Sequence, residues 1–145
     1  MSIVQGPTTS FLLELLQGIH DLDGDTLKIA LYSSSADLGP STTAYSTTNE
    51  VSGTGYSAGG SSLTATLANG TLTGYVDFAD VSWATSTLTA RCALIYNSSK
   101  SNRSIFVLDF GTDKSSSSST FSVVFPAPPN AVMIIAMSGN YNPVL

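Results

Sequence analysis

The residues that could do chemistry are few and far apart. His20 is the single histidine of the 145-residue chain, and it stands beside Asp21 at the end of a stretch with helical periodicity. Histidine is the usual general base at neutral pH, but a cation at a helix C-terminus also interacts favourably with the helix dipole. The capping interaction is the simpler explanation for a single histidine at the end of a helical stretch, so we expect His20 to cap a helix. The sequence predicts no catalytic residues and no enzymatic activity.

Three aspartates at alternate positions, Asp21, Asp23 and Asp25, resemble the start of a calcium-binding loop. Such a loop needs glycine at its sixth position and a bidentate glutamate at its twelfth. Here those positions are occupied by Thr26 and Tyr32. We therefore expect a polar turn between a helix and a strand, and no metal site.

Each of three further sets of residues has a possible chemical role and a simpler structural explanation. Asp77 and Asp80 could form the carboxylate pair of a glycosidase, but we expect them at a strand end and its turn. The glycine-rich stretch 53–60 lacks the Lys-Ser/Thr pair of a phosphate-binding loop, so its glycines more simply permit left-handed turns or close packing. Cys92 alternates with Leu94 and has no neighbouring base, which predicts a core residue. No cofactor is expected.

Composition restricts the function classes. Charged residues make up 10% of the chain, the net charge is −5, and the five Lys and Arg residues are dispersed. Because no basic patch exists to neutralise phosphates, we expect no nucleic-acid partner, and no segment predicts a membrane partner. Ser and Thr supply 41 positions, so neutral hydroxyls dominate a surface that can be buried against other subunits at little desolvation cost. The single cysteine fits folding in a reducing cytosol.

One segment, residues 10–20, has convincing helical periodicity after the N-cap run Thr8-Thr9-Ser10. Its apolar stripe is predicted as an interface and consists of Phe11, Leu12, Leu15, Leu16 and Ile19. Gly18 and the aspartate turn end the helix, and residues 26–33 follow as a half-buried strand.

Residues 34–60 contain almost no aliphatic pattern and are rich in Gly, Ser and Thr. Long loops of this kind usually carry function or become ordered on a partner. We therefore interpret the segment as an arm-like contact region, with Tyr45 and Tyr56 among its interface residues. Trp83, the only tryptophan, is in phase with Val81 and is interpreted as a core or interface residue.

The remaining chain predicts short strands at 63–68, 72–78, 81–84, 88–96, 105–110, 121–125 and 132–136. Asn69-Gly70 is a hairpin signal, and the serine run 115–119 is typical of a solvated turn. The stretch 132–136 is apolar on both faces and predicts a central or covered strand. The fold expected is mainly β: a single antiparallel β-sandwich or jelly-roll-like domain with a short N-terminal helix. Its parts are an N-terminal arm and helix (1–21), the arm-like loop (34–60), the main β region (61–137) and a tail (138–145).

Four ordered segments carry a resemblance: 48–60 (TNEVSGTGYSAGG), 75–83 (YVDFADVSW), 90–96 (ARCALIY) and 107–116 (VLDFGTDKSS). With the helix and the strand LDGDTLKIAL before them, they resemble a family of small virion structural proteins of tailed phages, similar to those of short-tailed cyanophages. The resemblance covers about residues 11–125. It implies a cement or decoration protein that binds the outer surface of the capsid shell, with the major capsid protein as partner. It also implies a homo-oligomer, with a trimer favoured, that is made in the host cytoplasm and located on the virion.

Two alternatives remain open at this stage. A tail, adaptor or fibre component of the virion would suit the same β-rich fold. A carbohydrate-binding module is the alternative from another class, and it would use Trp83, Tyr56 and Tyr75 as its stacking aromatics.

Overall fold

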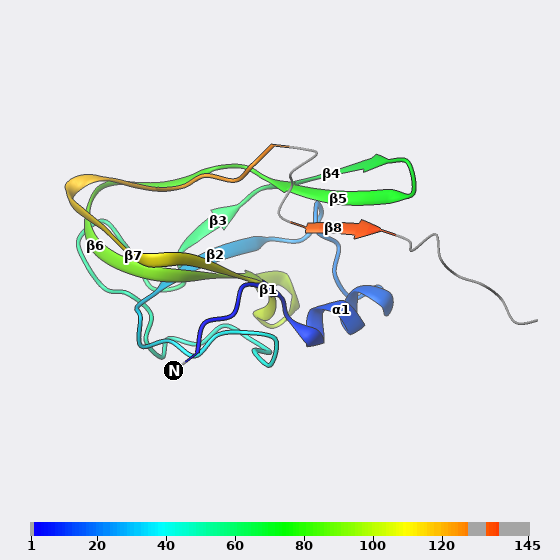
Figure 1. Ribbon diagram of the computed structural model, residues 1–145, viewed down its shortest axis with the longest axis horizontal. Coiled ribbons are helices and arrows are strands. Elements are labelled where there is room, and N and C mark those ends of the chain that lie inside the picture. The colour runs from blue at the N-terminus through cyan, green and yellow to red at the C-terminus, as the bar shows by residue number, and fades with distance from the viewer. Residues whose placement is uncertain (1, 128–132, 137–145) are drawn as a thin grey trace, which may run out of the picture.

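The computed structural model describes residues 2–127 and the backbone of residues 133–136. This described part of the chain is mainly β with one short α-helix, and its strands pair antiparallel (Figure 1). The elements are β1 (Gly6–Pro7), α1 (Thr9–Leu16), β2 (Leu27–Tyr32), β3 (Ser61–Leu63), β4 (Ala65–Gly70), β5 (Thr73–Phe78), β6 (Val81–Asn97), the 3-10 turn η1 (Ser98–Lys100), β7 (Arg103–Val123) and β8 (Met133–Ala136). The whole of the expected tail, 138–145, lies outside the described residues.

The helix is shorter than its apolar periodicity predicts. It begins after Thr8, whose backbone is extended, and ends at Leu16 because Gly18 adopts a left-handed φ of +70°. The Gly18 amide donates to the carbonyl of Leu15, and the Ile19 amide donates to the carbonyl of Glu14. This pair of bonds is a Schellman motif, which terminates a helix by satisfying its last carbonyls. The predicted role of Gly18 is confirmed, whereas the predicted helix end at residue 20 is wrong.

The described strands form two sheets. The larger has the strand order β1-β7-β6-β2-β3 and the smaller has the order β4-β5-β8. Neither sheet closes into a barrel in the described part of the chain. Among the described strands, β8 pairs only with β5 and stands at an edge of the small sheet. Of the two alternatives for 132–136, the central strand is therefore wrong, and the covered strand stays a prediction.

The dominant feature is a long ribbon formed by β6 and β7, which are 17 and 21 residues long. Four register shifts interrupt their pairing, and the ribbon bends back over the large sheet (Figure 1). Bulges of this kind increase local twist and let a strand pair change direction. The sequence predicts four separate strands here, with a turn at 115–119. The prediction of a turn is wrong. Ser116 is buried in β7, and its hydroxyl lies 2.7 Å from the hydroxyl of Ser86 on β6.

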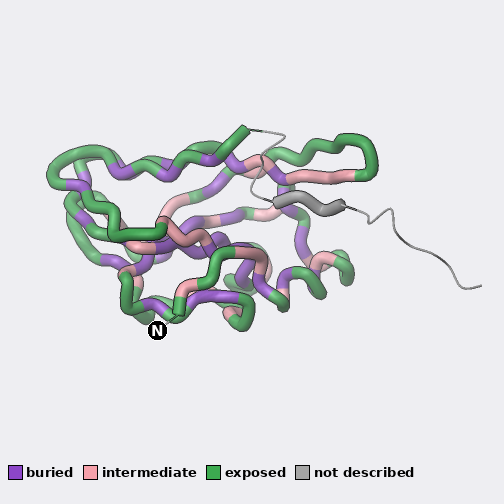
Figure 2. The backbone as a smooth tube through the Cα atoms, viewed as in Figure 1, coloured by how far each residue is buried: buried purple, intermediate pink, exposed green. Residues whose placement is uncertain are grey.

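The main core lies between the two halves of the bent ribbon. Its residues come from the inner face of the large sheet, from the overlying half of the ribbon, from β5 and from the helix; they include Phe11, Ile29, Leu31, Val76, Phe78, Trp83, Ile95 and Phe121. A tube coloured by burial shows this buried layer inside the bend, with exposed backbone around it (Figure 2). Trp83 is 7% exposed, so of its two predicted roles the core is the one observed.

The outer face of the large sheet is buried as well, because the 34–60 loop covers it. Ala30, Tyr32, Cys92 and Leu94 on the sheet form a second cluster with Ala36 and Leu38 of the loop, Tyr96, Val107, and partly buried Ile3 and Tyr45. The prediction that 26–33 is only half buried is therefore wrong. The 34–60 segment is irregular, as expected. It packs on the sheet, however, whereas the sequence predicts an arm-like contact region.

Candidate functional site

The helix presents only part of its predicted apolar stripe to the surface. Phe11 is fully buried in the main core, and Leu15 packs partly against it. Leu12 and Leu16 are exposed, the latter by 87%, and Leu13, which the periodicity left off the stripe, is 58% exposed. We call Leu12, Leu13 and Leu16 the exposed leucine face. The interface prediction is thus wrong for Phe11.

A buried polar network fixes this helix to the loop between β6 and β7. Glu14 pairs with Arg103 of β7 and with His20, whose Nε2 lies 2.8 Å from Glu14 Oε2. The Nδ1 atom of His20 lies 3.0 Å from Nδ2 of Asn97, and this amide also donates to Asp25. His20 is therefore a buried linking residue, and the prediction that it caps the helix is wrong.

Two carboxylates of this network are held ionised. Burial by itself raises the pKa of Glu14, but hydrogen bonds from His20 and Arg103 outweigh it, so the pKa is lowered. The pKa of Asp25 is lowered against the same opposing effect of burial, mainly by the hydrogen bond from Asn97. Asp25 therefore has a structural role in this network. In the described residues no three His, Cys, Asp or Glu side chains converge on a point that could hold a metal ion.

Tyr45 and Tyr56, the two loop residues predicted as interface, instead tie the loop to the sheet. Their hydroxyls each donate to the carboxylate of Glu50 at 2.7 Å, and the Gly59 amide donates to the same group at 2.7 Å. The Tyr45 ring stacks on Tyr96 of β6 with ring centroids 4.7 Å apart. Burial raises the pKa of the Tyr56 hydroxyl, which keeps it protonated and able to donate. Both tyrosines are partly buried by these internal contacts.

The aromatic residues of the carbohydrate-binding alternative are poorly placed for sugars. Trp83 is buried, with the Tyr56 ring 5.8 Å away on one side and the Phe121 ring 6.1 Å away on another. Stacking on a sugar needs an accessible ring face. The proposed role of Trp83 in stacking is therefore wrong. Asp80, one of the two carboxylates considered as a glycosidase pair and expected at a strand end and its turn, accepts a hydrogen bond from the backbone amide of Phe125.

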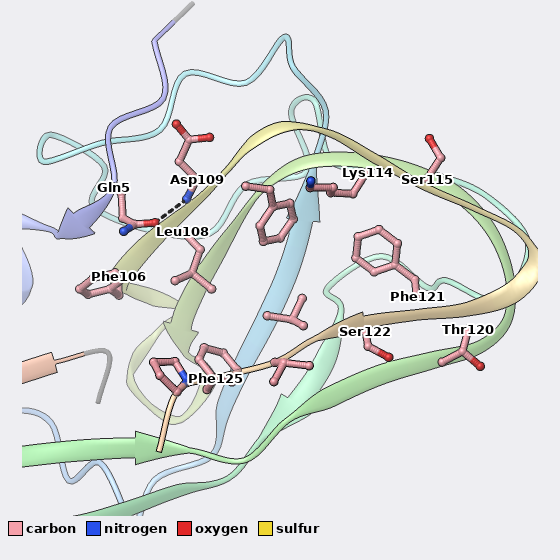
Figure 3. Close-up of a pocket in the computed structure, with 14 residues that line it drawn as sticks. Gln5, Phe106, Leu108, Asp109, Lys114, Ser115, Thr120, Phe121, Ser122 and Phe125 are labelled. Atoms are coloured by element: carbon pink, nitrogen blue, oxygen red, sulfur yellow. Dashed lines mark hydrogen bonds between the residues drawn. The ribbon is translucent and has the colours of Figure 1, made fainter. Parts of the chain in front are cut away.

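A hollow lies between the two halves of β7. It has a volume of ≈ 690 Å³ and is open to solvent. Its apolar lining comes from alternate residues of the two halves: Phe106, Leu108 and Phe110 on one, and Phe121, Val123 and Phe125 on the other. Figure 3 shows Phe106 and Leu108 on the first half and Phe121 and Phe125 on the second, around one space. We call this hollow the β7 groove.

The strand that borders the groove is largely unpaired on its outer side. Of the described strands, only β1 pairs there, and it reaches just Phe106 and Val107. The Asp109 amide is the next group along, and it donates to the side chain of Gln5 at 3.1 Å. Unpaired strand edges are templates for pairing with another chain. The groove therefore combines a largely unpaired strand edge with apolar side chains of the core. Phe106, Phe121, Val123 and Phe125 are buried there, and Leu108 and Phe110 are partly buried.

Sequence reasoning missed this groove because it depends on the bend of the ribbon. The alternation of Phe106, Leu108 and Phe110, and that of Phe121, Val123 and Phe125, are visible in the sequence. The sequence predicts each of them only as part of a short strand. Only the fold-back of β7 on itself places the two rows opposite each other.

Comparison with known proteins gives no relative of this chain: no family model, curated protein or solved structure matches it. Among the described residues, no helix has the length and apolarity needed to cross a membrane.

Proposed function

We propose that this chain is a structural protein of a tailed-phage particle, a cement or decoration protein that binds the outer surface of the capsid shell. The observation that carries the proposal is the exposed leucine face, on a chain with few charges and many hydroxyls. The choice of a phage particle comes from the resemblance of four ordered sequence segments. We also propose that the fold is a β-sandwich of the jelly-roll type.

The exposed leucine face suits a protein partner. Leu12, Leu13 and Leu16 lie within two helical turns, and leucines grouped on a helix surface are typical of docking into an apolar groove. The helix is anchored by Phe11 in the core and by the pair of Glu14 with Arg103. Because these contacts on its buried side hold the helix in place, little conformational entropy is lost when the leucines bind.

The surface around this face suits burial in a crowded lattice. Ser and Thr hydroxyls can be desolvated at lower cost than Lys or Glu side chains. Many weak contacts on a symmetric shell add up through effective concentration. The major capsid protein is the partner that we propose for the exposed leucine face.

The experiment replaces Leu12, Leu13 and Leu16 with aspartate in phage that encode this chain. We expect the variant to be lost from purified particles, and the particles to become as sensitive to heat and osmotic shock as particles lacking the gene. Gln17→Asp, which adds charge at an exposed position beside the same helix, is the control and should be retained. Full resistance of particles without the protein would contradict a cementing role.

Location on the particle separates this proposal from a tail, adaptor or fibre component. Cryo-electron microscopy of the virion should show density over the shell lattice, with a copy number that follows the symmetry of the shell. Density confined to the tail would replace the capsid assignment with the tail alternative.

A further inference from the structure

The small sheet ends in a strand edge that nothing in the described chain covers. β4 pairs with β5 along its whole length, and its other edge has no partner among the described strands. Edge strands of natural proteins are usually protected by short length, charges, proline or bulges. β4 is six residues long, is mostly exposed, and contains neither a charge nor proline. The stretch 51–76, which includes the whole β4–β5 hairpin loop, has no charged residue at all.

The hairpin formed by β4 and β5 also exposes apolar side chains. Leu67 is 48% exposed and Leu72, at the hairpin turn, is 70% exposed. Figure 1 shows the hairpin projecting from one end of the molecule, while the bend of the β6–β7 ribbon forms the other end. A projecting, neutral and unprotected edge has the properties of a strand that pairs with another chain.

We propose that the free edge of β4 pairs with the free edge of β7 in a second copy of this chain, with Leu67 against the β7 groove. The two surfaces match in length: six residues of β4 and the five residues 121–125 each extend roughly 17–20 Å. Both surfaces are also poor in charge, since β4 has no charged residue. The groove has two charged residues, Asp109 and Lys114, and Asp109 is paired with Arg91 at 3.1 Å.

The same hairpin does not reach the groove of its own chain. The base of the hairpin adjoins the groove, since the rings of Phe78 on β5 and Phe125 lie 5.5 Å apart. From Phe78 the strand runs away to Thr73, roughly 17 Å along β5. The turn and the free edge of β4 are therefore directed away from their own groove, and the contact has to be made with a neighbouring molecule.

This contact joins two different surfaces, so it is heterologous. Repeating it generates a closed ring if the rotation between copies closes, and an open chain if it does not. Each copy contributes a hairpin to one neighbour and a groove to the other. The inference goes beyond capsid binding and concerns the purified protein alone.

The test uses two variants that each disable one surface. Leu67→Asp places a charge on the hairpin, and Thr120→Arg places a bulky charge at an exposed position that lines the groove. Both positions are exposed, so both variants should fold, as circular dichroism will check; Leu72→Asp and Ser122→Arg form a second pair. By light scattering at high concentration, the unmodified protein should be oligomeric and each variant a monomer of 15.0 kDa.

The decisive sample is an equimolar mixture of the two variants. The intact groove of Leu67→Asp can accept the intact hairpin of Thr120→Arg, so the mixture should form a dimer of twice the monomer mass and nothing larger. The controls are Gln17→Asp, an exposed position beside the helix, and Thr112→Arg, an exposed position of β7; neither position lines the groove, and both variants should assemble like the unmodified protein. A monomeric unmodified protein, oligomeric single variants, or a mixture that stays monomeric would each overturn the proposal. None of these results bears on binding to a capsid.

Discussion

The Nε2 atom of His20 lies 2.8 Å from the Oε2 atom of Glu14, in an environment that excludes most solvent. The orientation of the Asn97 amide assigns the histidine tautomer. Its oxygen accepts from the Ser99 amide, so its nitrogen faces His20 and donates to Nδ1. The proton of the neutral imidazole is therefore on Nε2, from which it is donated to Glu14. Helix α1, the aspartate turn and the β6–β7 loop are joined through this one chain of hydrogen bonds.

The first prediction concerns acid stability. Glu14 and Asp25 bind protons more weakly in the folded protein than in the unfolded chain, because their pKa values are lowered from 4.5 and 3.8. The unfolded state takes up more protons as the pH falls through this range, so the free energy of unfolding should decrease there. Glu14→Gln should lower stability at neutral pH by about 1–3 kcal/mol, since Arg103 loses its ionic partner. It should also flatten the decrease in stability below about pH 4.5.

Urea denaturation at a series of pH values measures both effects. Asp113→Asn, which removes an exposed carboxylate on β7, serves as the control and should keep the pH profile of the unmodified protein. An equally steep loss of stability in Glu14→Gln would show that the network does not cause it.

The second prediction separates the two faces of the helix. Phe11 is completely buried, so Phe11→Ala should cost about 3–5 kcal/mol of unfolding free energy through lost transfer energy and a cavity. Leu16 is almost fully exposed, so Leu16→Ala should change stability by less than about 0.5 kcal/mol. Denaturant midpoints measure the difference. Similar values for the two variants would mean that the helix does not pack as described.

Local signals predicted the strands well and their connections poorly. The alternation around Ile29 and Ile95 correctly indicates β structure, and Asn69-Gly70 indicates a hairpin whose two-residue turn is at Thr71 and Leu72. The serine run at 115–119 has a turn composition, yet a long partner strand supplies hydrogen bonds to it. Non-local pairing of this kind overrides local propensity.

The candidate surfaces were less predictable because they depend on what covers each face. Periodicity identifies the apolar stripe of the helix. It does not show that Phe11 is buried in the core while Leu13 is exposed. In the sequence, Tyr45 and Tyr56 resemble contact residues. In the structure, both hydroxyls donate to the carboxylate of Glu50. The β7 groove requires the bend of one strand, which no pattern within a short window contains.

The third prediction tests the close contact between the loop and β2. Gly60 has a φ of +73°, and a Cβ atom there would lie 1.8 Å from the carbonyl oxygen of Ile29. Gly18 has almost the same φ, +70°, but nothing lies within 4 Å of its Cβ position. Gly18→Ala should cost about 1–2 kcal/mol from the left-handed backbone alone. Gly60→Ala should cost about 1–3 kcal/mol more, because the backbone must move.

Thermal or urea unfolding of both variants gives the comparison. Equal costs at the two positions would mean that the 34–60 loop does not lie against β2. Hydrogen exchange of the Val51 amide, which donates to the Leu31 carbonyl, should increase in Gly60→Ala and stay unchanged in Gly18→Ala.

The last prediction concerns the only thiol. Burial, aided by the negative charge of Asp109 and opposed by Arg91, raises the pKa of Cys92 to about 12. Because the thiolate is the reactive form, alkylation at about pH 8 should be slower than for a free cysteine by a factor on the order of 1,000. Thr112→Cys in a Cys92→Ala background provides an exposed thiol on a neighbouring strand and should react at the ordinary rate. Mass spectrometry after timed alkylation follows both. Denaturant should remove the difference, since the protection comes from the 34–60 loop covering the face of the sheet that holds Cys92; rapid labelling of the native protein would contradict that cover.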